Sequence, residues 1–332
     1  MHKTAFLISL TLSVMMISCN ENKSSKQKTK AEPVVQQIIE VPEFNADSAF
    51  EFVKAQCDFG PRVPGTQEHK DCASYLSNQL KKYTTNVIVQ NAKVRMYNNE
   101  LQDCKNIVAS FAPDKKERIL LAAHWDSRFV ADHDPIPANR TKAVPGANDG
   151  ASGVGVLMEI ARVISKNQPD VGVDIILFDM EDQGAPESKQ TSRQNTWGLG
   201  SQYWAANPHI FGYKAKYGIL LDMIGAANAQ FVKEGFSMEY APNLVEKVWT
   251  AGKNLGHDSY FVDVQGGRID DDHLYINAIA KIPTIDIIHL DPNSVNGSFF
   301  DYWHTINDDL SKIDKSSLKV VGETVLHVIY HE

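Results

Sequence analysis

Two apolar runs, 119-ILLAAH-124 and 171-VGVDIILF-178, decide the fold class of this chain. Each run is short, almost continuously apolar and rich in Ile, Leu and Val, which is typical of a strand buried on both faces. Between them, residues 153–165 repeat apolar side chains at three- and four-residue intervals, as one face of a helix does. A buried strand, a helix and a second buried strand in this order predict an α/β protein.

The same pattern continues on both sides of these runs. Helices are expected over 47–56 and 69–82, and strands over 86–96, 106–111, 217–223 and 284–289. Because this part of the sequence shows neither a second linker nor an internal repeat, one domain over residues 43–332 is the simplest organisation. We therefore predict a single α/β domain in which helices flank a central mixed, mostly parallel β-sheet.

The N-terminal residues have the character of a targeting segment. A basic start precedes an apolar run over residues 4–18, which is too short to span a bilayer comfortably. The run ends in Ser18-Cys19, which resembles the processing site of bacterial lipoproteins, although an ordinary secretory signal with a chance Cys is an alternative. We expect a signal peptide over 1–19 and a polar tether over 20–42. A lipid anchor at Cys19 would then hold the protein in the bacterial cell envelope, in the periplasm or at the surface.

The composition excludes several classes of protein. The chain has 332 residues, of which 43% are hydrophobic and 22% are charged, so it is neither a disordered nor a fibrous protein. Lys and Arg number 33 against 41 Asp and Glu, and the net charge of −8 argues against nucleic acid as a partner. We expect membrane contact only through the anchor. The three cysteines other than Cys19 are too few for a disulfide scaffold, and we interpret them as structural.

Acidic residues and histidines follow the predicted strands. These residues are His124, Asp126, Asp149, Asp179, Glu181, Asp182, Asp222, Asp270, Asp271, Asp272, His273 and His304. Ligand sites of α/β sheets lie outside the carboxyl ends of the strands, so we expect these side chains to converge there. So many carboxylates would repel one another unless a divalent cation lay among them. Ligands of the His, Asp and Glu types without Cys are typical of catalytic zinc.

Each of these residues also has an ordinary interpretation. Asp149, in 146-GANDGASG-153, could simply cap a helix. Glu181 and Asp182 could belong to a solvated loop, and His304 could be an ordinary loop histidine. We interpret His289, near the end of an apolar strand, as a buried structural histidine. Only the conjunction of these motifs predicts a metal site. The neighbours Glu181 and Asp182 should point in different directions, so that one binds metal while the other acts as a base.

The order of the motifs resembles that of the zinc aminopeptidase (M28) superfamily. The motifs are HWDS (124–127), GANDGASG (146–153), MED (180–182), LLDMIG (220–225) and WHT (303–305). Within the superfamily, the chain is most similar to the animal-type glutaminyl-peptide cyclotransferases, or glutaminyl cyclases, and their bacterial relatives. The resemblance runs from about Phe52 to the C-terminus. The stretch 271-DDH-273 and the pair Trp303-His304 favour the cyclase branch.

The resemblance implies a role for each residue of the motifs. Asp149, Asp182 and His304 would bind one zinc ion per chain, which would act as a Lewis acid. Glu181 would be the general acid/base, Asp222 and Asp271 would form a carboxylate network beside it, and Trp303 and Trp197 would line the substrate pocket. The enzyme would convert the N-terminal Gln of peptides and proteins into pyroglutamate and release ammonia. The animal enzymes usually carry Glu where Asp182 stands, and their second pocket Trp comes earlier in the chain than Trp197.

Two other functions stay open. A di-zinc aminopeptidase would use His124 and Asp222 for a second metal, with Asp149 bridging and Glu181 activating a water molecule, and this full ligand set is present. Metal content near one or near two zinc ions per chain separates that enzyme from a cyclase. A non-catalytic binding protein on the same scaffold should lack ligands, and none is missing here.

Overall fold

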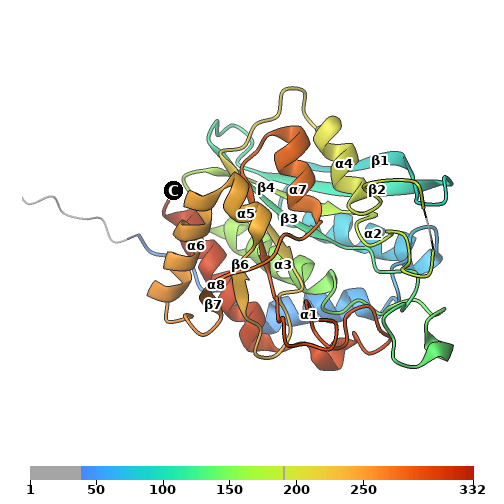
Figure 1. The fold of residues 1–332 in the computed structure, drawn as a ribbon. Coiled ribbons are helices and arrows are strands. Elements are labelled where there is room, and N and C mark those ends of the chain that lie inside the picture. Colours follow the sequence, from blue (N-terminus) through green and yellow to red (C-terminus); the bar gives the residue numbers. More distant parts are fainter. Residues whose placement is uncertain (1–38, 190) are drawn as a thin grey trace, which may run out of the picture. The chain divides into compact units, whose positions relative to one another are not determined.

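The computed structural model of the chain describes residues 39–332 except residue 190 (Figure 1). The helices are α1 (Ala46–Cys57), α2 (Gln67–Leu80), α3 (Ala151–Lys166), α4 (Leu199–Ala206), α5 (Gly235–Tyr240), α6 (Pro242–Asn254), α7 (Asp272–Tyr275), which continues as a π-helix over Ile276–Ala280, and α8 (Lys315–Tyr330). The strands are β1 (Val87–Arg95), β2 (Leu101–Phe111), β3 (Arg118–His124), β4 (Gly172–Phe178), β5 (Tyr217–Asp222), β6 (Phe231–Lys233), β7 (Phe261–Gln265) and β8 (Thr284–Ile288). Every expected helix and strand occurs, with ends shifted by a few residues.

The central sheet is mixed, as the sequence predicts. Its six strands lie in the order β1-β2-β4-β3-β5-β8. Strands β4, β3, β5 and β8 are parallel to one another, whereas β2 is antiparallel to both of its neighbours, β1 and β4. The fold class is therefore confirmed: a single α/β domain with a mixed sheet flanked by helices.

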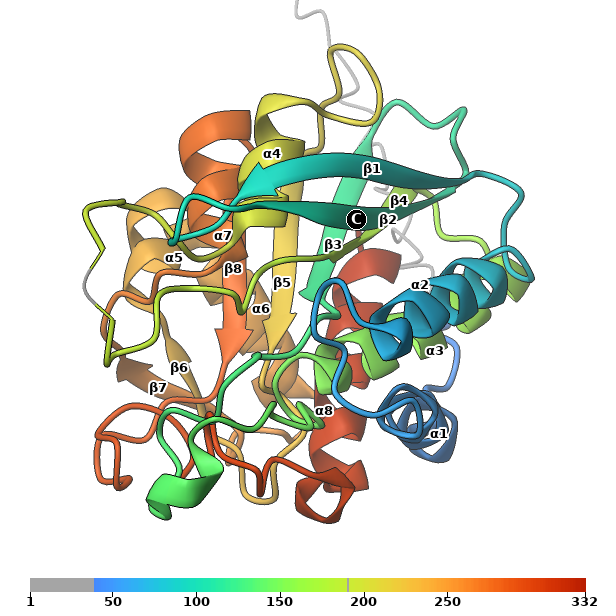
Figure 2. The same ribbon diagram turned by 90° about the vertical axis from the view of Figure 1, so that its right-hand side faces the viewer.

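Helices cover both faces of the sheet, which explains the uninterrupted apolar runs. Along β3, Leu121 and Ala123 pack into the core beneath α1, α3 and α8, and the alternate residues Leu120 and Ala122 pack against α4 and the π-helix. Figure 2 shows α1, α2, α3 and α8 on one side of the sheet and α4 and α7 on the other. A strand that faces solvent on neither side shows no alternation of polar and apolar residues.

Strand β2 begins earlier than the sequence suggests. Residues 101–105 continue the antiparallel pairing with β1, from Leu101 opposite Arg95 to Lys105 opposite Asn91. This end of the strand alternates between exposed and half-buried residues, because no helix covers it completely. An apolar run therefore identifies only the buried half, 106–111, and the expected strand was too short.

A second, two-stranded sheet stands beside the carboxyl end of β8. Strands β6 and β7 pair in parallel, and Phe231 of β6 forms a bridge with His289, the residue after β8. Helix α6 packs against α8 and β7, with Trp249 in contact with Phe261 at 5.4 Å between ring centroids. This small sheet and its loops extend the wall of the main sheet on the side where β8 ends.

The predicted signal peptide, the anchor at Cys19 and the tether up to residue 38 lie outside the described residues. Over residues 39–189 and 191–332, no helix combines the length and the apolar character that crossing a membrane requires.

Candidate active site

The carboxyl ends of the parallel strands surround a cavity of about 300 Å³. Strand β3 ends at His124, the loop after β4 carries Glu181 and Asp182, and β5 ends at Asp222. The residues that line the cavity are Asp149, Glu181, Asp182, Trp197, Asp222, Met223, Arg268, Ile269, Asp270, Asp271, Ile288, Ser298, Phe299, Trp303 and His304. The predicted ligands, acid/base and pocket residues Asp149, Glu181, Asp182, Asp222, Asp271, His304, Trp197 and Trp303 therefore all line this cavity. Five of the residues that were expected to converge here are buried without lining it: His124, Asp126, Asp179, Asp272 and His273.

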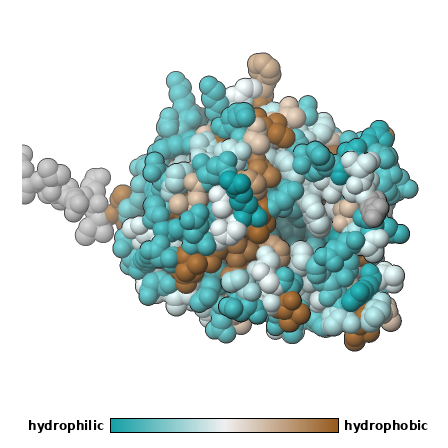
Figure 3. Space-filling model, in the orientation of Figure 1, coloured by the Kyte–Doolittle hydropathy of each residue, from teal (hydrophilic) through white to brown (hydrophobic). Residues whose placement is uncertain are grey.

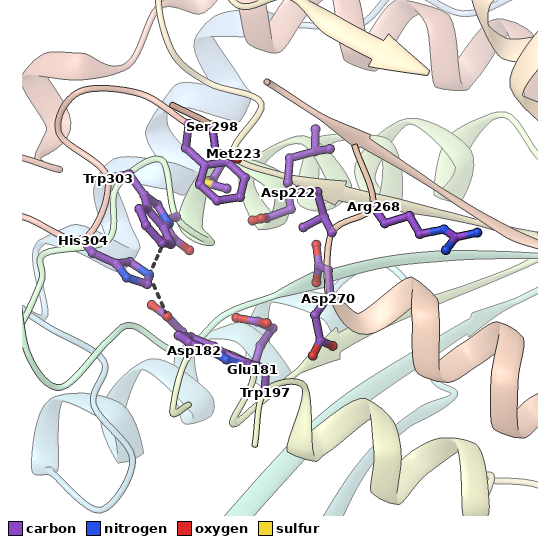
Figure 4. Close-up of a pocket in the computed structure, with 15 residues that line it drawn as sticks. Glu181, Asp182, Trp197, Asp222, Met223, Arg268, Asp270, Ser298, Trp303 and His304 are labelled. Carbon is purple, nitrogen blue, oxygen red and sulfur yellow. Dashed lines mark ion pairs between the residues drawn. The ribbon is translucent and has the colours of Figure 1, made fainter. Parts of the chain in front are cut away.

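Three of these residues form a compact donor set. His304 Nε2 lies 3.1 Å from Asp182 Oδ1 and 3.6 Å from Asp149 Oδ2. All three side chains are buried, with 4% of Asp149 exposed and less of the other two. Figure 4 shows Asp182 turned toward His304, while the neighbouring Glu181 points into the cavity. One residue of this adjacent pair therefore belongs to the donor set, and the other faces the space that a substrate would occupy.

A second donor set shares Asp149 with the first. His124 Nε2 lies 3.0 Å from Asp149 Oδ1 and 3.1 Å from Asp222 Oδ1. One oxygen of Asp149 thus faces each histidine. The carboxylate stands where a ligand that bridges two metal ions would stand.

The first set fits a zinc ion. Two ligands bound at 2.0–2.1 Å in tetrahedral geometry lie about 3.3 Å apart, close to the separations around His304 Nε2. Asp182 Oδ2 is buried without a hydrogen-bond partner, and burial together with the charge of Asp149 raises the pKa of Asp182 well above its usual value. Burial, with the nearby charge of Arg128, lowers the pKa of His304 well below its usual value, so its ring is neutral. A neutral imidazole between crowded carboxylates is the electronic state that a divalent cation requires of its ligands.

His124 is in the opposite electronic state. Burial alone would lower its pKa, but the surrounding carboxylates of Asp126, Asp149 and Asp222 outweigh burial and raise the pKa well above the usual value. In the metal-free protein these carboxylates therefore favour the protonated form of His124. The two donor sets therefore differ in charge although their geometry is similar.

Two buried carboxylates hold the loops that carry the donors. Asp126 accepts hydrogen bonds from the backbone N–H groups of Glu181 and Asp182, at 3.1 and 3.2 Å. Asp308 accepts from the N–H groups of Asn148 and Asp149, at 2.9 and 3.1 Å. Each carboxylate thus fixes two consecutive peptides next to the cavity. Asp126 belongs to the HWDS motif, whereas nothing in the sequence pattern marked Asp308.

The glycines of 146-GANDG-150 meet two specific requirements. Gly146 has φ of +66°, a conformation that side chains disfavour. Gly150 lies against His124, and a Cβ at this position would stand 2.4 Å from the carbonyl oxygen of His124. Helix α3 begins directly after Gly150, and no side chain caps it, so Asp149 is not its cap.

Several residues beside the cavity have a strained backbone. Met180, Met223 and His304 have φ of +60°, +47° and +52° although none is a glycine. Each such residue costs about 1–3 kcal/mol, and conformations of this kind cluster at functional sites. Met180 and Met223 adjoin Glu181 and Asp222, so the strain lies where side chains are aimed into the cavity.

The acidic side of the cavity favours protonated carboxyl groups. Burial, and then the charges of Asp271 and Asp182, raise the pKa of Glu181 well above its usual value, although His124 opposes this shift. Burial and the charge of Asp271 raise the pKa of Asp222 to about 7. A group whose pKa lies near neutrality gains and loses a proton readily, which general acid–base catalysis requires.

Aromatic rings form the opposite wall. Trp303 stacks on the ring of His304 with centroids 3.7 Å apart, and Phe299 lies 4.7 Å from Trp303. The ring of Trp197 lies 5.9 Å from that of His304 and nearly parallel to it. The site therefore has an acidic side and an aromatic side, with the first donor set between them.

Arg128 is a buried residue that the sequence reasoning missed. Its guanidinium donates to both oxygens of Asp132, at 2.8 and 2.6 Å, and to the carbonyl oxygen of Asp182 at 3.2 Å. It also lies 4.6 Å from the ring centroid of Trp197. Asp132 in turn lies 3.6 Å from His304 Nδ1. Arg128 therefore connects the donor set to the aromatic wall, and its place directly after HWDS was the available signal.

His289 and the cysteines lie outside the reactive centre. His289 Nδ1 accepts a hydrogen bond from the backbone of Gln230 at 2.8 Å, its ring stacks on Phe300, and burial lowers its pKa to about 4. The three described cysteines, Cys57, Cys72 and Cys104, are free thiols. Burial raises the pKa of each, so none is activated as a nucleophile.

Comparison with known proteins places these features in a family. A model described as "Peptidase family M28" matches residues 106–329. A glutaminyl cyclase structure from Bacteroides thetaiotaomicron, bound to N-acetylhistamine, is 50% identical, covers 88% of this chain and all of its own, and superposes with a TM-score of 0.86. A Zn-dependent exopeptidase from Parabacteroides distasonis is 48% identical over 88% of this chain and all of its own, with a TM-score of 0.87. The bovine glutaminyl-peptide cyclotransferase is 26% identical over 244 residues, which are 64% of this chain and 62% of that protein.

Proposed function

This chain belongs to peptidase family M28, and from that premise we propose that it is a zinc-dependent glutaminyl-peptide cyclotransferase, an acyltransferase. The observation that carries the proposal is the arrangement of one cavity. The donor set of Asp149, Asp182 and His304, the carboxyl group of Glu181 and the ring of Trp303 all face the same space. The similarity to bacterial structures named glutaminyl cyclases, at 50% and 51% identity over 88% of the chain, supports this reaction.

The reaction joins the α-amine nitrogen of an N-terminal Gln to the carbon of its own side-chain amide. The bond from that carbon to the amide nitrogen breaks, and ammonia leaves. A zinc ion held by Asp149, Asp182 and His304 would supply Lewis-acid polarisation of the amide oxygen and stabilise the negative charge that develops there.

Glu181 moves the proton. Its carboxylate takes a proton from the α-amine as the nitrogen attacks, and returns it to the departing amide nitrogen. The raised pKa suits both steps, since a carboxyl group of ordinary acidity would be a weak base. Asp222 and Asp271 stand beside Glu181 with raised pKa values, so one proton can be shared among the three groups.

The aromatic side of the cavity binds and orients the substrate. Trp303, Phe299 and Trp197 line one side of the cavity of about 300 Å³, and this aromatic side suits a small uncharged side chain. The amide of Gln is uncharged and planar, so it can lie against an indole ring while its oxygen faces the donor set. No external water is consumed, which distinguishes this chemistry from peptide hydrolysis.

We propose one zinc ion per chain, bound at the first donor set. In support, Asp182 Oδ2 has no other partner, whereas His124 Nε2 lies within hydrogen-bond distance of both Asp149 and Asp222. The second donor set nevertheless favours one alternative, a di-zinc aminopeptidase, and similar structures at 43% to 49% identity are named exopeptidases or a leucine aminopeptidase precursor. In that enzyme Asp149 would bridge two ions and Glu181 would activate water.

The natural partners would be peptides and proteins with an N-terminal Gln, and the enzyme would work in the cell envelope. The apolar run before Cys19 supports a lipid-anchored location, and this proposal is independent of the catalytic one. A strain that lacks the gene should export proteins with fewer pyroglutamyl ends. An unchanged fraction of such ends would contradict this setting.

Removal and return of the metal test the proposed reaction. The full-length protein should release ammonia from a Gln-initiated peptide faster than the spontaneous background. A chelator should abolish this release, and zinc should restore it. Release that survives complete removal of the metal would refute a zinc-dependent cyclase.

A further inference from the structure

A second groove of about 240 Å³ adjoins the catalytic cavity. Its lining residues are Val232, Val264, Gln265, Gly266, Gly267, Ile269, Leu290, Pro292, Gly297 and Ser298. Two of these, Ile269 and Ser298, also line the catalytic cavity. The two spaces are therefore neighbours that share Ile269 and Ser298 in their walls.

The groove is apolar and carries no charged residue in its lining. Val232 of β6 and Leu290 are buried, while 56% of Val264 on β7 is exposed. Figure 3 shows hydrophobic residues gathered on this face over β6, beside a hollow in the surface. Arg268, which lines the catalytic cavity but not the groove, pairs with Glu239 at 2.7 Å. The groove thus offers contact to an uncharged side chain, and no charged residue of its lining can pair with a charged one.

The walls of the groove are held in place by hydrogen bonds. The backbone N–H groups of Ser298 and Phe299 donate to Asn296 Oδ1 at 3.0 and 2.6 Å. The N–H of Gly266 donates to the carbonyl oxygen of Lys233 at 2.8 Å, which joins the end of β7 to β6. The groove is therefore formed before a ligand arrives, and filling it costs little ordering of the protein.

The position of the groove indicates its occupant. In the proposed reaction the N-terminal Gln fills the catalytic cavity, and the rest of the peptide must leave it. Consecutive Cα atoms are about 3.8 Å apart, so the next residue emerges directly beside the first. On this basis, and resting on the proposed function, we propose that the groove binds the side chain of the second substrate residue and selects apolar residues there.

The test compares three peptides that differ only in the second residue: Gln-Leu-Gly-Gly, Gln-Ala-Gly-Gly and Gln-Glu-Gly-Gly. With the full-length zinc-loaded protein, kcat/KM for the Leu peptide should exceed that for the Ala peptide about tenfold, as apolar contacts in a pocket discriminate. The Glu peptide should be the poorest substrate. Val264→Asp should reduce the Leu-to-Ala ratio to about one. Val295→Asp is the matched control, because Val295 is 88% exposed and does not line the groove, and its ratio should equal that of the wild type.

Each outcome of this comparison either supports or refutes the proposed role of the groove. Equal kcat/KM values for the three peptides would refute the role of the groove in binding the second residue, without affecting the proposed cyclase activity. So would a Leu preference that Val264→Asp leaves unchanged. Absence of ammonia release from all three peptides would overturn the proposed function and this inference with it. A preference lost in Val264→Asp and kept in Val295→Asp would support the groove.

Discussion

Replacement of Glu181 by Gln separates the catalytic role of this residue from any structural one. The substitution keeps the size of the side chain and removes its proton chemistry. Loss of a general acid–base group costs about 10²–10⁴ in rate, or about 3–5 kcal/mol of transition-state stabilisation. Glu181 is not a member of the donor set around His304, so the zinc content of the variant should equal that of the wild type.

The stability of the Glu181→Gln variant should not fall. Only 8% of the residue is exposed, and burial with the charges of Asp271 and Asp182 raises its pKa. The folded state therefore binds a proton more tightly than the unfolded state does, and the ionised form destabilises the metal-free protein near pH 7. A neutral amide removes this repulsion, so the Tm of the metal-free variant should equal or exceed that of the wild type.

The assay is ammonia release from a Gln-initiated peptide, together with zinc analysis and thermal unfolding. The matched control is Glu187→Gln, because Glu187 lies six residues further on and its side chain is 73% exposed. That variant should keep the activity of the wild type. Activity of Glu181→Gln within threefold of the wild type would refute its role as the acid/base. Loss of activity accompanied by loss of zinc or of the fold would show a structural role instead.

Three further predictions concern the metal and its supports. The His304→Ala variant should lose most of its zinc, whereas the His124→Asn variant should keep close to one zinc ion per chain, as measured by elemental analysis. Two zinc ions per chain in the wild type would contradict the single-zinc site. Asp308→Asn should weaken zinc binding about 10–100-fold, because the carboxylate that fixes the peptides of Asn148 and Asp149 is lost. Asp309→Asn, at the neighbouring half-buried helix cap, should leave zinc affinity unchanged, and equal effects of the two variants would refute the role of Asp308. The free energy of unfolding of the metal-free protein should fall between about pH 4 and pH 7. The pKa of Asp222 is about 7 in the folded protein against 3.8 ordinarily, so protonated Asp222 stabilises the fold fully below pH 3.8, and this stabilisation is lost as the pH rises toward 7. Zinc should therefore raise Tm more at pH 8 than at pH 5, and an equal rise at both values would contradict this electrostatic origin.

The fold could be predicted because burial on both faces leaves a direct mark on sequence. Strands β3 and β4 have no solvent-facing side, so their residues form continuous apolar runs. Short strands at the border of the domain leave no such mark. Strand β6 has three residues, and β7 is mostly exposed, so neither stands out from a loop. The groove that these strands line was for this reason beyond the reach of sequence reasoning.

Most donor residues could be identified because they stand at or shortly after the end of a strand, or just before a helix, whereas His304 lies in a long loop after β8 and was identified from its motif. Parallel strands bring their carboxyl ends to one edge of the sheet, so residues as distant as His124 and Asp222 come within 3.1 Å. The residues that support them act through the backbone or through packing, and residue type does not reveal this. Asp308 binds two backbone N–H groups, and Arg128 packs beneath Trp197. Such contacts appear only when the folded loops are seen together.

The most direct test of the account is the mass of the product. The full-length zinc-loaded protein is incubated with one peptide that begins with Gln and a second that begins with Leu, and both are followed by mass spectrometry against enzyme-free controls. The account predicts that the Gln peptide loses only ammonia and that the Leu peptide stays intact. Release of the free N-terminal residue from either peptide would identify an aminopeptidase and bring His124 and Asp222 into a second metal site.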